Sequence, residues 1–308
     1  MAIDTVRVQI NGTWTMLTKN QSTGKYEGTI AAPNITSFNK TGGHYPVTVE
    51  AKDLAGNITT VNDTHATLGS KLKLVVKETT KPTITIITPA AGAYIGSNTP
   101  AISFQLRDEI NGSGIKITSL ALKIDNGSTV TNTSNGMVVT AVTGGYDVTY
   151  TPQTALIDGS HTVKINIQDN DGNAATEASR SFVVDTIPPE LSVTNPADAT
   201  SYKNTASLTV TGNTNDATSS PVTVTIKLNN VDQGAITVDG SGNFSKTVTL
   251  TEGSNTIEVK ATDKAGKYTI VARTVILDTV APTVNNITIV PNPVNTGQSY
   301  VITVDVSD

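Results

Sequence analysis

The sequence predicts an all-β protein built from tandem β-sandwich modules, and three observations support this. The chain is rich in Thr, Val, Asn, Gly and Ile, residues typical of strands and turns. Apolar and polar residues alternate over many short stretches, which is the period of a half-buried strand. One stretch, Leu156 to Asn173, is repeated elsewhere in the chain, which indicates a tandem array of a single module.

The repeated stretch reads as a turn, a strand and a second turn. In each copy a glycine precedes an aspartate by ten residues, with alternating apolar residues between them: Gly159 and Asp169, Gly253 and Asp263, and Gly43 and Asp53. Glycine permits the entry turn and aspartate begins the exit turn. We call this the signature strand of each module.

Composition excludes several kinds of site and partner. The chain has 308 residues and no cysteine, so disulfides and thiolate metal sites are impossible. The net charge is −5 without blocks of one sign, which argues against nucleic acid and anionic membranes as partners. The start of the sequence is unlike a signal peptide, and no apolar run is long enough for membrane insertion. We therefore expect a protein made and folded in a cytoplasm.

The first module, residues 1–78, is expected to be incomplete. Val6, Val8 and Ile10 alternate, Asn11-Gly12 forms a hairpin turn, and the return strand carries Trp14. Further strands are expected at Tyr26 to Ile30, Tyr45 to Ala51 and Leu72 to Val76. This order matches the other modules from their third strand onward, so the first two strands are missing.

Residues 79–185 and 186–278 form complete second and third modules. Each shows about seven short strands with turn signals between them, the pattern of a β-sandwich. In the second module the strands are expected at Thr83 to Ile87, Ile102 to Leu106, Leu120 to Ile124, Met137 to Val142, Val148 to Tyr150, the signature strand and Phe182 to Val184. In the third they are expected around Leu191, Leu208, Val222 to Leu228, Phe244 to Leu250, Ile257 to Ala261 and Val271 to Leu277.

The second, third and fourth modules begin at similar junctions: Glu78 to Pro82, Asp185 to Pro189 and Asp278 to Pro282. Proline fixes its own φ and restricts the preceding residue. The links are therefore short and stiff, and we expect a semi-rigid rod.

These residues resemble the bacterial immunoglobulin-like (Big-type) tandem repeats. The resemblance rests on the last strands, with Gly, His or Asn, alternating Val, and then Ala-x-Asp-x-Ala-Gly: Gly253, Asn255, Ile257, Ala261, Asp263 and Gly266, with Gly43, Ala51, Asp53 and Gly56 in the first module. The copy that begins with Gly159, His161 and Val163 departs after Asp169, where Asn170-Asp171 stands in place of Lys264-Ala265. It implies tandem Ig-like sandwiches and does not specify one function. The organisation is also similar to small Ig-like structural proteins in the virions of phages of Gram-positive hosts, which implies a role in the tail region.

Residues 279–308 match the first two strands of a fourth module, the two strands that the first module lacks. A lone hairpin is marginal in water, and an incomplete module exposes a sheet edge. We predict that this C-terminal fragment completes the first module of a neighbouring copy by β-strand addition, head to tail. The assembly residues are predicted to be Val284, Ile287, Ile289, Tyr300, Ile302, Val304 and Val306 on one side and Val6, Val8 and Ile10 on the other. The two ends could instead meet within one chain, another protein could supply the strands, or both ends could be trimmed from a longer array.

No residue pattern indicates catalysis or a cofactor, so we expect a protein that is not an enzyme. His161 occupies a position held by Asn255 and Tyr45 in the other modules, which predicts local hydrogen bonding. Trp14 is expected to pack across strands rather than to stack on a sugar. Metal binding is not expected, although the weak candidates for calcium are Asp169, Asp171, Asp185 and Asp278, for which turn formation is the competing interpretation.

The favoured function is a structural protein of a phage virion, assembled in the host cytoplasm. Its expected partners are its own copies, other virion proteins and host cell-surface glycans that its modules bind weakly. The alternative is part of a bacterial cell-surface adhesin or stalk. A third interpretation, an accessory carbohydrate-binding array of an enzyme, lacks the aromatic patch that it requires.

Overall fold

The computed structural model describes residues 2–308, and the chain forms two compact units. The first runs to Ala93 and resumes at Thr99–Phe182, whereas the second contains Tyr94–Asn98 and Val183–Asp308. Strands dominate both units, and the short 3₁₀ helices are η1 (Thr41–Gly43), η2 (Gly69–Lys71) and η3 (Ile117–Ser119). Within residues 2–308, no helix combines the length and apolar character required to cross a membrane. The predicted all-β, multi-module sandwich fold is confirmed.

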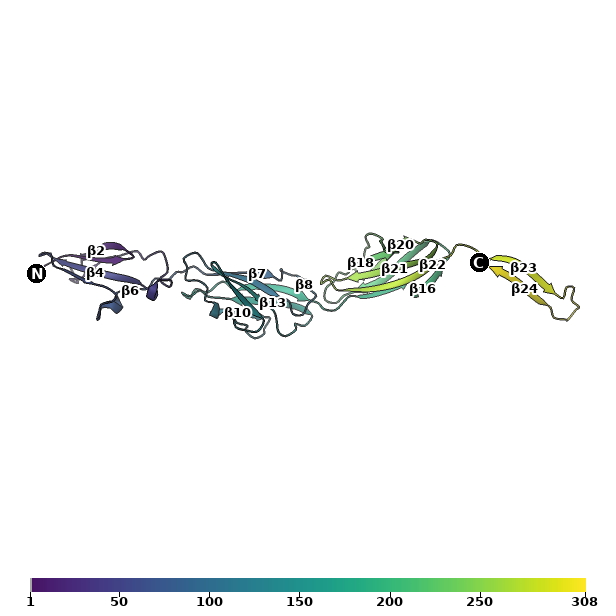
Figure 1. Ribbon diagram of the computed structural model, residues 1–308, viewed down its shortest axis with the longest axis horizontal. Coiled ribbons are helices and arrows are strands. Elements are labelled where there is room, and N and C mark those ends of the chain that lie inside the picture. The colour runs from purple at the N-terminus through teal and green to yellow at the C-terminus, as the bar shows by residue number, and fades with distance from the viewer. Residues whose placement is uncertain (1) are drawn as a thin grey trace. The chain divides into compact units, whose positions relative to one another are not determined.

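The first module is a single sheet (Figure 1). Its strands follow the order β3-β2-β1-β4-β5, with β6 also paired to β4. Their bounds are β1 Ile3–Ile10, β2 Thr13–Lys19, β3 Tyr26–Glu27, β4 Tyr45–Asp53, β5 Ile58–Val61 and β6 Lys73–Leu74. Asn11 and Gly12 both have positive φ, at 48° and 84°, as the tight β1–β2 hairpin turn requires.

The second module is a two-sheet sandwich. One sheet has the order β11-β12-β9-β7 and the other β10-β13-β14, with short β8 pairing in parallel to the end of β14. Buried side chains such as Ile102, Phe104 and Leu106 from one sheet and Leu122 and Ile165 from the other form its core. The bounds are β7 Thr83–Thr88, β8 Tyr94–Ile95, β9 Ile102–Arg107, β10 Ala121–Ile124, β11 Met137–Val142, β12 Gly145–Tyr150, β13 Gly159–Asn166 and β14 Ala178–Val184.

The third module repeats this arrangement. Its sheets have the orders β15-β17-β20 and β16-β22-β21-β18-β19, and they enclose a core that includes Val210, Ile226 and Val259. The bounds are β15 Glu190–Asn195, β16 Thr200–Lys203, β17 Ser207–Asn215, β18 Thr223–Leu228, β19 Val231–Asp232, β20 Asn243–Thr249, β21 Gly253–Thr262 and β22 Tyr268–Leu277.

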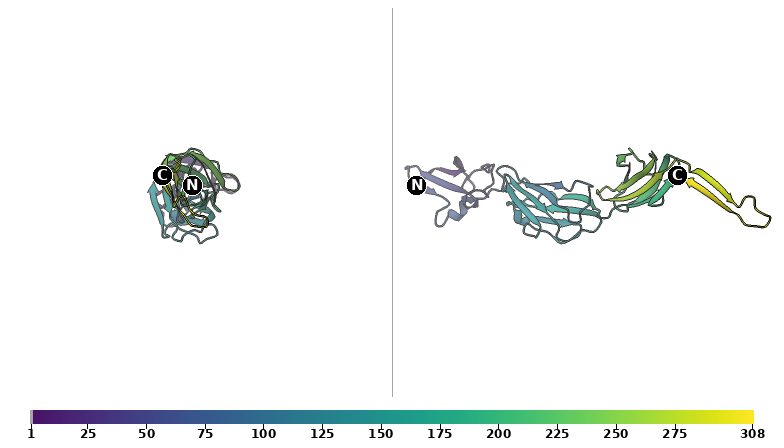
Figure 2. Two further views of the ribbon diagram at one scale, coloured as in Figure 1. Left: turned by 90° about the vertical axis from the view of Figure 1, so that its right-hand side faces the viewer. Right: turned by 45° about the vertical axis from the view of Figure 1, so that its right-hand side comes forward.

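The C-terminal fragment is a two-stranded hairpin of β23 (Thr283–Val290) and β24 (Val301–Ser307). Every residue of both strands is exposed. Figure 1 and Figure 2 show the hairpin in yellow as two paired strands. The hairpin therefore has no core of its own.

The register of paired strands shows that the first module corresponds to one sheet of a complete module. In the third module β18 pairs with β21 through Val224–Ala261, Ile226–Val259 and Leu228–Ile257, and these side chains are buried. In the first module β1 pairs with β4 through Val6–Ala51, Val8–Val49 and Ile10–Val47. Val8 is buried, but the other five are only half-buried because no second sheet lies over them.

The structure differs from the predicted strands in several places. The strand expected at Tyr26 to Ile30 is limited to Tyr26–Glu27, and that expected at Leu72 to Val76 is limited to Lys73–Leu74. Both segments belong to the module without a facing sheet, so they have few strands to pair with. The additional strands β5, β8, β16 and β19 are two to four residues long. Such short strands give no readable alternation.

Candidate metal centre

Three buried aspartates meet in the second unit. Asp185, Asp216 and Asp263 each place a carboxylate oxygen within 4.8 Å of the other two. Their exposed fractions are 0%, 9% and 6%, so all three are largely removed from water. Oxygen donors grouped in this way suit a hard divalent cation such as Ca²⁺.

Each of the three aspartates directly follows a strand, which is how residues distant in sequence come together. Asp185 follows β14, Asp216 follows β17 and Asp263 follows β21. Turn hydrogen bonds then fix the carboxylates. Oδ1 of Asp216 accepts from the backbone N–H groups of Thr218 and Ser219, at 2.8 and 2.7 Å, and the Ser219 hydroxyl donates to Asp185.

The cluster carries negative charge that the described residues do not balance. No ion pair among residues 2–308 involves Asp185, Asp216 or Asp263. Oδ1 of Asp263 accepts from the Lys267 backbone N–H at 2.8 Å, but buried Oδ2 has no hydrogen-bond partner. Leaving a buried carboxylate oxygen unpaired is costly, and a cation would satisfy it.

Electrostatics and space agree with this interpretation. Burial raises the pKa of Asp263, and the charges of Asp185 and Asp216 raise it further, against the hydrogen bond from Lys267. Two like charges about 4.8 Å apart repel by on the order of 3 kcal/mol at an effective dielectric constant of about 20. A hollow of about 130 Å³, lined in part by Asp185 and Asp216, opens beside the cluster.

A second acidic group lies in the first unit. Carboxylate oxygens of Glu78, Asp108 and Glu109 lie within 4.8 Å of one another. One oxygen of each residue is buried without a hydrogen-bond partner. Burial raises the pKa of Glu78, and the neighbouring carboxylate of Glu109 raises it further, while the bond from Ser113 opposes it. Glu78 and Asp108 occupy the same places in the second module as Asp185 and Asp216 in the third.

The four aspartates predicted from the sequence have different surroundings. Asp169 is fully buried, and both of its oxygens accept hydrogen bonds, from Gly172 and Asn173, so it forms a closed turn. Asp171 accepts from the Thr36 hydroxyl and from the Glu78 backbone N–H, which links the first module to the second. Asp278 is exposed and accepts from the Val280 backbone N–H. Only Asp185 of the predicted set belongs to a three-carboxylate group.

The sequence patterns did not identify Asp216, Asp263 or the Glu78 group as members of such clusters. Their positions relative to the paired strands could have indicated Asp108 and Asp216. β7 pairs with β9 through Thr83 and Arg107, and β15 pairs with β17 through Glu190 and Asn215. In both modules the residue that follows the second partner is an aspartate, Asp108 or Asp216. This correspondence could have been found by aligning the ends of the second strands.

His161 makes local hydrogen bonds, as its position predicted. Its Nδ1 lies 2.7 Å from Oδ2 of Asp125 and its Nε2 lies 2.7 Å from the Ile157 carbonyl. Burial lowers the pKa of His161, but the bonds to Ile157 and Asp125 outweigh burial and raise it. At the position of His161 in the other modules, Asn255 donates to the Thr251 carbonyl and the hydroxyl of Tyr45 donates to the Ile35 carbonyl. These contacts hold turns in place.

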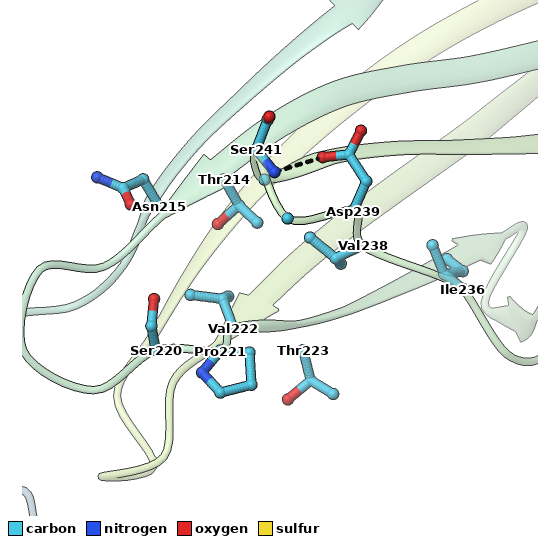
Figure 3. A pocket seen from close by; sticks show the side chains of 12 residues that line it. Thr214, Asn215, Ser220, Pro221, Val222, Thr223, Ile236, Val238, Asp239 and Ser241 are labelled. Atoms are coloured by element: carbon cyan, nitrogen blue, oxygen red, sulfur yellow. Dashed lines mark hydrogen bonds between the residues drawn. The ribbon is translucent and has the colours of Figure 1, made fainter.

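One hollow of the third module offers few groups for ligand chemistry. This hollow measures about 590 Å³ and lies between the end of β17, the start of β18 and the loop before β20 (Figure 3). Its twelve lining residues include no aromatic ring. Its one acidic side chain, Asp239, is held by bonds from Ser241 and Asn243. Trp14 packs across strands, with the guanidinium of Arg7 4.3 Å from the ring centroid.

Two family models match stretches of this chain. Residues 97–186 match the model of a bacterial Ig-like domain, and residues 189–279 match that of glucodextranase domain B. Among solved structures, the chain is similar to the fibronectin(III)-like modules of Clostridium thermocellum CbhA, with 17% identity, a TM-score of 0.39 and coverage of 64% of this chain and 94% of that chain. It is also similar to Sidekick-1 immunoglobulin domains 1–5, with 12% identity, a TM-score of 0.37 and coverage of 92% and 56%. No curated protein sequence matches this chain. The chain carries Ig-like modules in tandem, as structural and adhesion proteins do.

Proposed function

We propose that this protein is a non-enzymatic structural protein whose copies join head to tail by strand complementation. The β23–β24 hairpin of one copy supplies the sheet that the first module of the next copy lacks. Such a contact is heterologous, so it continues from copy to copy until a ring closes or a filament forms.

The observation that carries the proposal is the exposed apolar face of the hairpin. Three apolar pairs lie directly opposite one another on this face: Val284 and Val306, Ile287 and Val304, and Ile289 and Ile302. Their exposed fractions lie between 42% and 58%. A β-bulge between Val284 and Asn286 brings Val284 onto the same face as Ile287 and Ile289.

The same positions form the core of the second module. Thr283 pairs with Ser307 as Thr83 pairs with Arg107, so Ile302, Val304 and Val306 correspond to Ile102, Phe104 and Leu106. Those three residues are at most 1% exposed. The hairpin thus has the pattern of a sandwich sheet without its partner, and the half-buried face of β1 and β4 is the matching surface.

Sedimentation velocity over a range of concentrations tests this proposal with the full chain. The wild-type protein is expected to form oligomers. Val304→Asp is expected to abolish them, because it places a charge on the hairpin face that the proposed contact between copies would bury. Thr303→Asp, one residue away on the opposite face, is the matched control and is expected to leave assembly intact. A wild-type chain that stays monomeric at high concentration, or equal assembly of both variants, would contradict the proposal.

We assign this array to the exterior of a phage virion, with other virion proteins and host cell-surface glycans as further partners. Support comes from the resemblance to small Ig-like virion proteins and from the tandem Ig-like modules. The alternative is a bacterial cell-surface adhesin or stalk. Labelled antibody against the purified chain, applied to phage particles and to bacterial cells, separates the two locations by electron microscopy.

A further inference from the structure

Asp185 belongs to the chain segment that enters the third module, and both its backbone and its side chain are held. It directly follows Val184, the last residue of β14. Its backbone N–H donates to the Ile95 carbonyl at 2.9 Å, which continues the parallel pairing of β8 with β14. Its side chain accepts hydrogen bonds from the Ile187 backbone N–H and from the Ser219 hydroxyl. The carboxylate therefore has a fixed position at the start of the module.

The other two members of the group come from the two different sheets of the third module. Asp216 follows β17, in the sheet β15-β17-β20, and Asp263 follows β21, in the sheet β16-β22-β21-β18-β19. All three aspartates belong to the second compact unit, and their carboxylate oxygens lie within 4.8 Å of one another. An ion bound here would therefore contact the ends of both sheets and the entering segment at once.

The hydrogen bonding of Asp263 points to a bound cation independently of the clustering. Asp263 is only 6% exposed, and its buried Oδ2 has no hydrogen-bond partner. The next residue, Lys264, places its Nζ 5.0 Å from the centroid of the Tyr94 ring, and no ion pair within residues 2–308 links it to the group. A buried carboxylate oxygen left in this way is costly, and a cation supplies the missing partner.

The same feature recurs in the second module. There the carboxylate oxygens of Glu78, Asp108 and Glu109 lie within 4.8 Å of one another, and one buried oxygen of each has no hydrogen-bond partner. Buried polar atoms without partners are rare in folded proteins, and an ion is one of the explanations for them. Their occurrence in acidic groups of two modules supports a common cause.

We propose that Asp185, Asp216 and Asp263 bind one Ca²⁺ ion, which fixes the entering segment to the ends of both sheets of the third module. The three donors are carboxylate oxygens, which suit Ca²⁺ better than a metal that prefers nitrogen or sulfur ligands. The hollow of about 130 Å³ beside Asp185 and Asp216 leaves room for water molecules to complete the coordination. The site lies within one chain, so it does not depend on the head-to-tail assembly proposed above.

Isothermal titration calorimetry with CaCl₂ tests the site in the full chain after treatment with a chelator. Asp216→Asn and Asp263→Asn each keep a side-chain oxygen for the turn hydrogen bonds and remove one negative charge from the group. Each is expected to lose one bound ion, or to bind it at least about tenfold more weakly than the wild type. Asp239→Asn, at an exposed turn aspartate of the same module, is the matched control and is expected to bind as the wild type does. A wild type that binds no calcium, or two cluster variants that bind it as the wild type does, would overturn the site.

Hydrogen exchange followed by mass spectrometry tests whether the ion fixes the entering segment. If release of this segment opens the site, calcium at 100 times its dissociation constant is expected to slow exchange of the Asp185 and Ile187 amides by about 100-fold in the wild type. In Asp263→Asn, calcium at the same concentration is expected to have little effect on these amides, whereas Asp239→Asn is expected to behave as the wild type does. Equal exchange with and without calcium in a wild type that binds the ion would overturn the fixing of the segment.

Discussion

Val284 lies directly opposite Val306 across the β23–β24 hairpin, and both side chains are more than half exposed. The corresponding pair in the second module is Ile84 and Leu106, in which Leu106 is fully buried. The same cross-strand pairing thus occurs once inside a core and once in water. A face of this kind is stabilised when another sheet covers it.

The polarity of the proposed joint predicts the behaviour of mixtures. Val6→Asp damages the surface of the first module and leaves the hairpin intact, whereas Val304→Asp does the reverse. Each variant alone is expected to be monomeric. Mixed in equal amounts, they are expected to form a dimer and no larger species, because only one intact joint is possible. Size-exclusion chromatography with light scattering measures this.

The control for the mixture uses two chains with the same defect. Val304→Asp mixed with a differently tagged Val304→Asp is expected to remain monomeric. Larger oligomers in the Val6→Asp and Val304→Asp mixture would show that the surfaces join in some other way.

Burial predicts opposite effects for two corresponding residues. Phe104 is 1% exposed, so Phe104→Ala is expected to destabilise the second module by about 3–5 kcal/mol. Val304 is 47% exposed, and Val304→Ala is expected to change monomer stability by less than about 0.5 kcal/mol while weakening association. Urea unfolding at a concentration below association, compared with sedimentation at a higher one, separates the effects. A large loss of monomer stability in Val304→Ala would show that the hairpin packs within its own chain.

The sequence predicted the sheets well because the strands alternate clearly. The signature strands β4, β13 and β21 and the hairpin β23–β24 were predicted from period-2 patterns and turn residues. The parallel pairings of β8 and β16 were not predicted, because strands of two to four residues, such as Tyr94–Ile95, are too short to show an alternation of apolar and polar residues. The acidic groups were predicted only through Asp185, since Asp185, Asp216 and Asp263 follow three separate strands that only the folded sheets bring together.

The unpartnered carboxylate predicts the effect of Asp263→Asn on stability. Burial and the neighbouring aspartates raise the pKa of Asp263, so the charged form is disfavoured in the folded state. In a chelator at neutral pH, the neutral asparagine is expected to stabilise the third module by about 1 kcal/mol, or about 4–8 °C for a domain of this size. Thermal unfolding followed by circular dichroism measures the change.

Calcium provides the complementary measurement for this variant. Calcium is expected to raise the thermal unfolding midpoint of the wild-type third module, because a ligand that binds only the folded state stabilises that state. The increase is expected to be lost or reduced in Asp263→Asn. Asp239→Asn, an exposed turn aspartate of the same module, serves as the control and is expected to retain the full calcium effect. If the thermal unfolding midpoint of Asp263→Asn in a chelator falls below that of the wild type, the Asp263 charge does not destabilise the folded module and the prediction is wrong.

His161 predicts a pH dependence confined to the second module. Although burial lowers its pKa, the bonds to Ile157 and Asp125 raise it above the unfolded value of about 6.5. The protonated form of the imidazole is therefore favoured by folding. The resulting stabilisation is fully present below about pH 6.5 and is lost as the pH rises through the folded pKa.

Urea unfolding between about pH 5.5 and 8.5 measures this dependence. His161→Asn introduces the residue that occupies the same place in the third module, and it is expected to remove the decline in stability with rising pH. His65→Asn, at an exposed histidine of the first module, is the matched control and is expected to leave the decline unchanged. Stability of the second module that rises with pH across this range would mean that burial, rather than the two hydrogen bonds, governs the charge of His161.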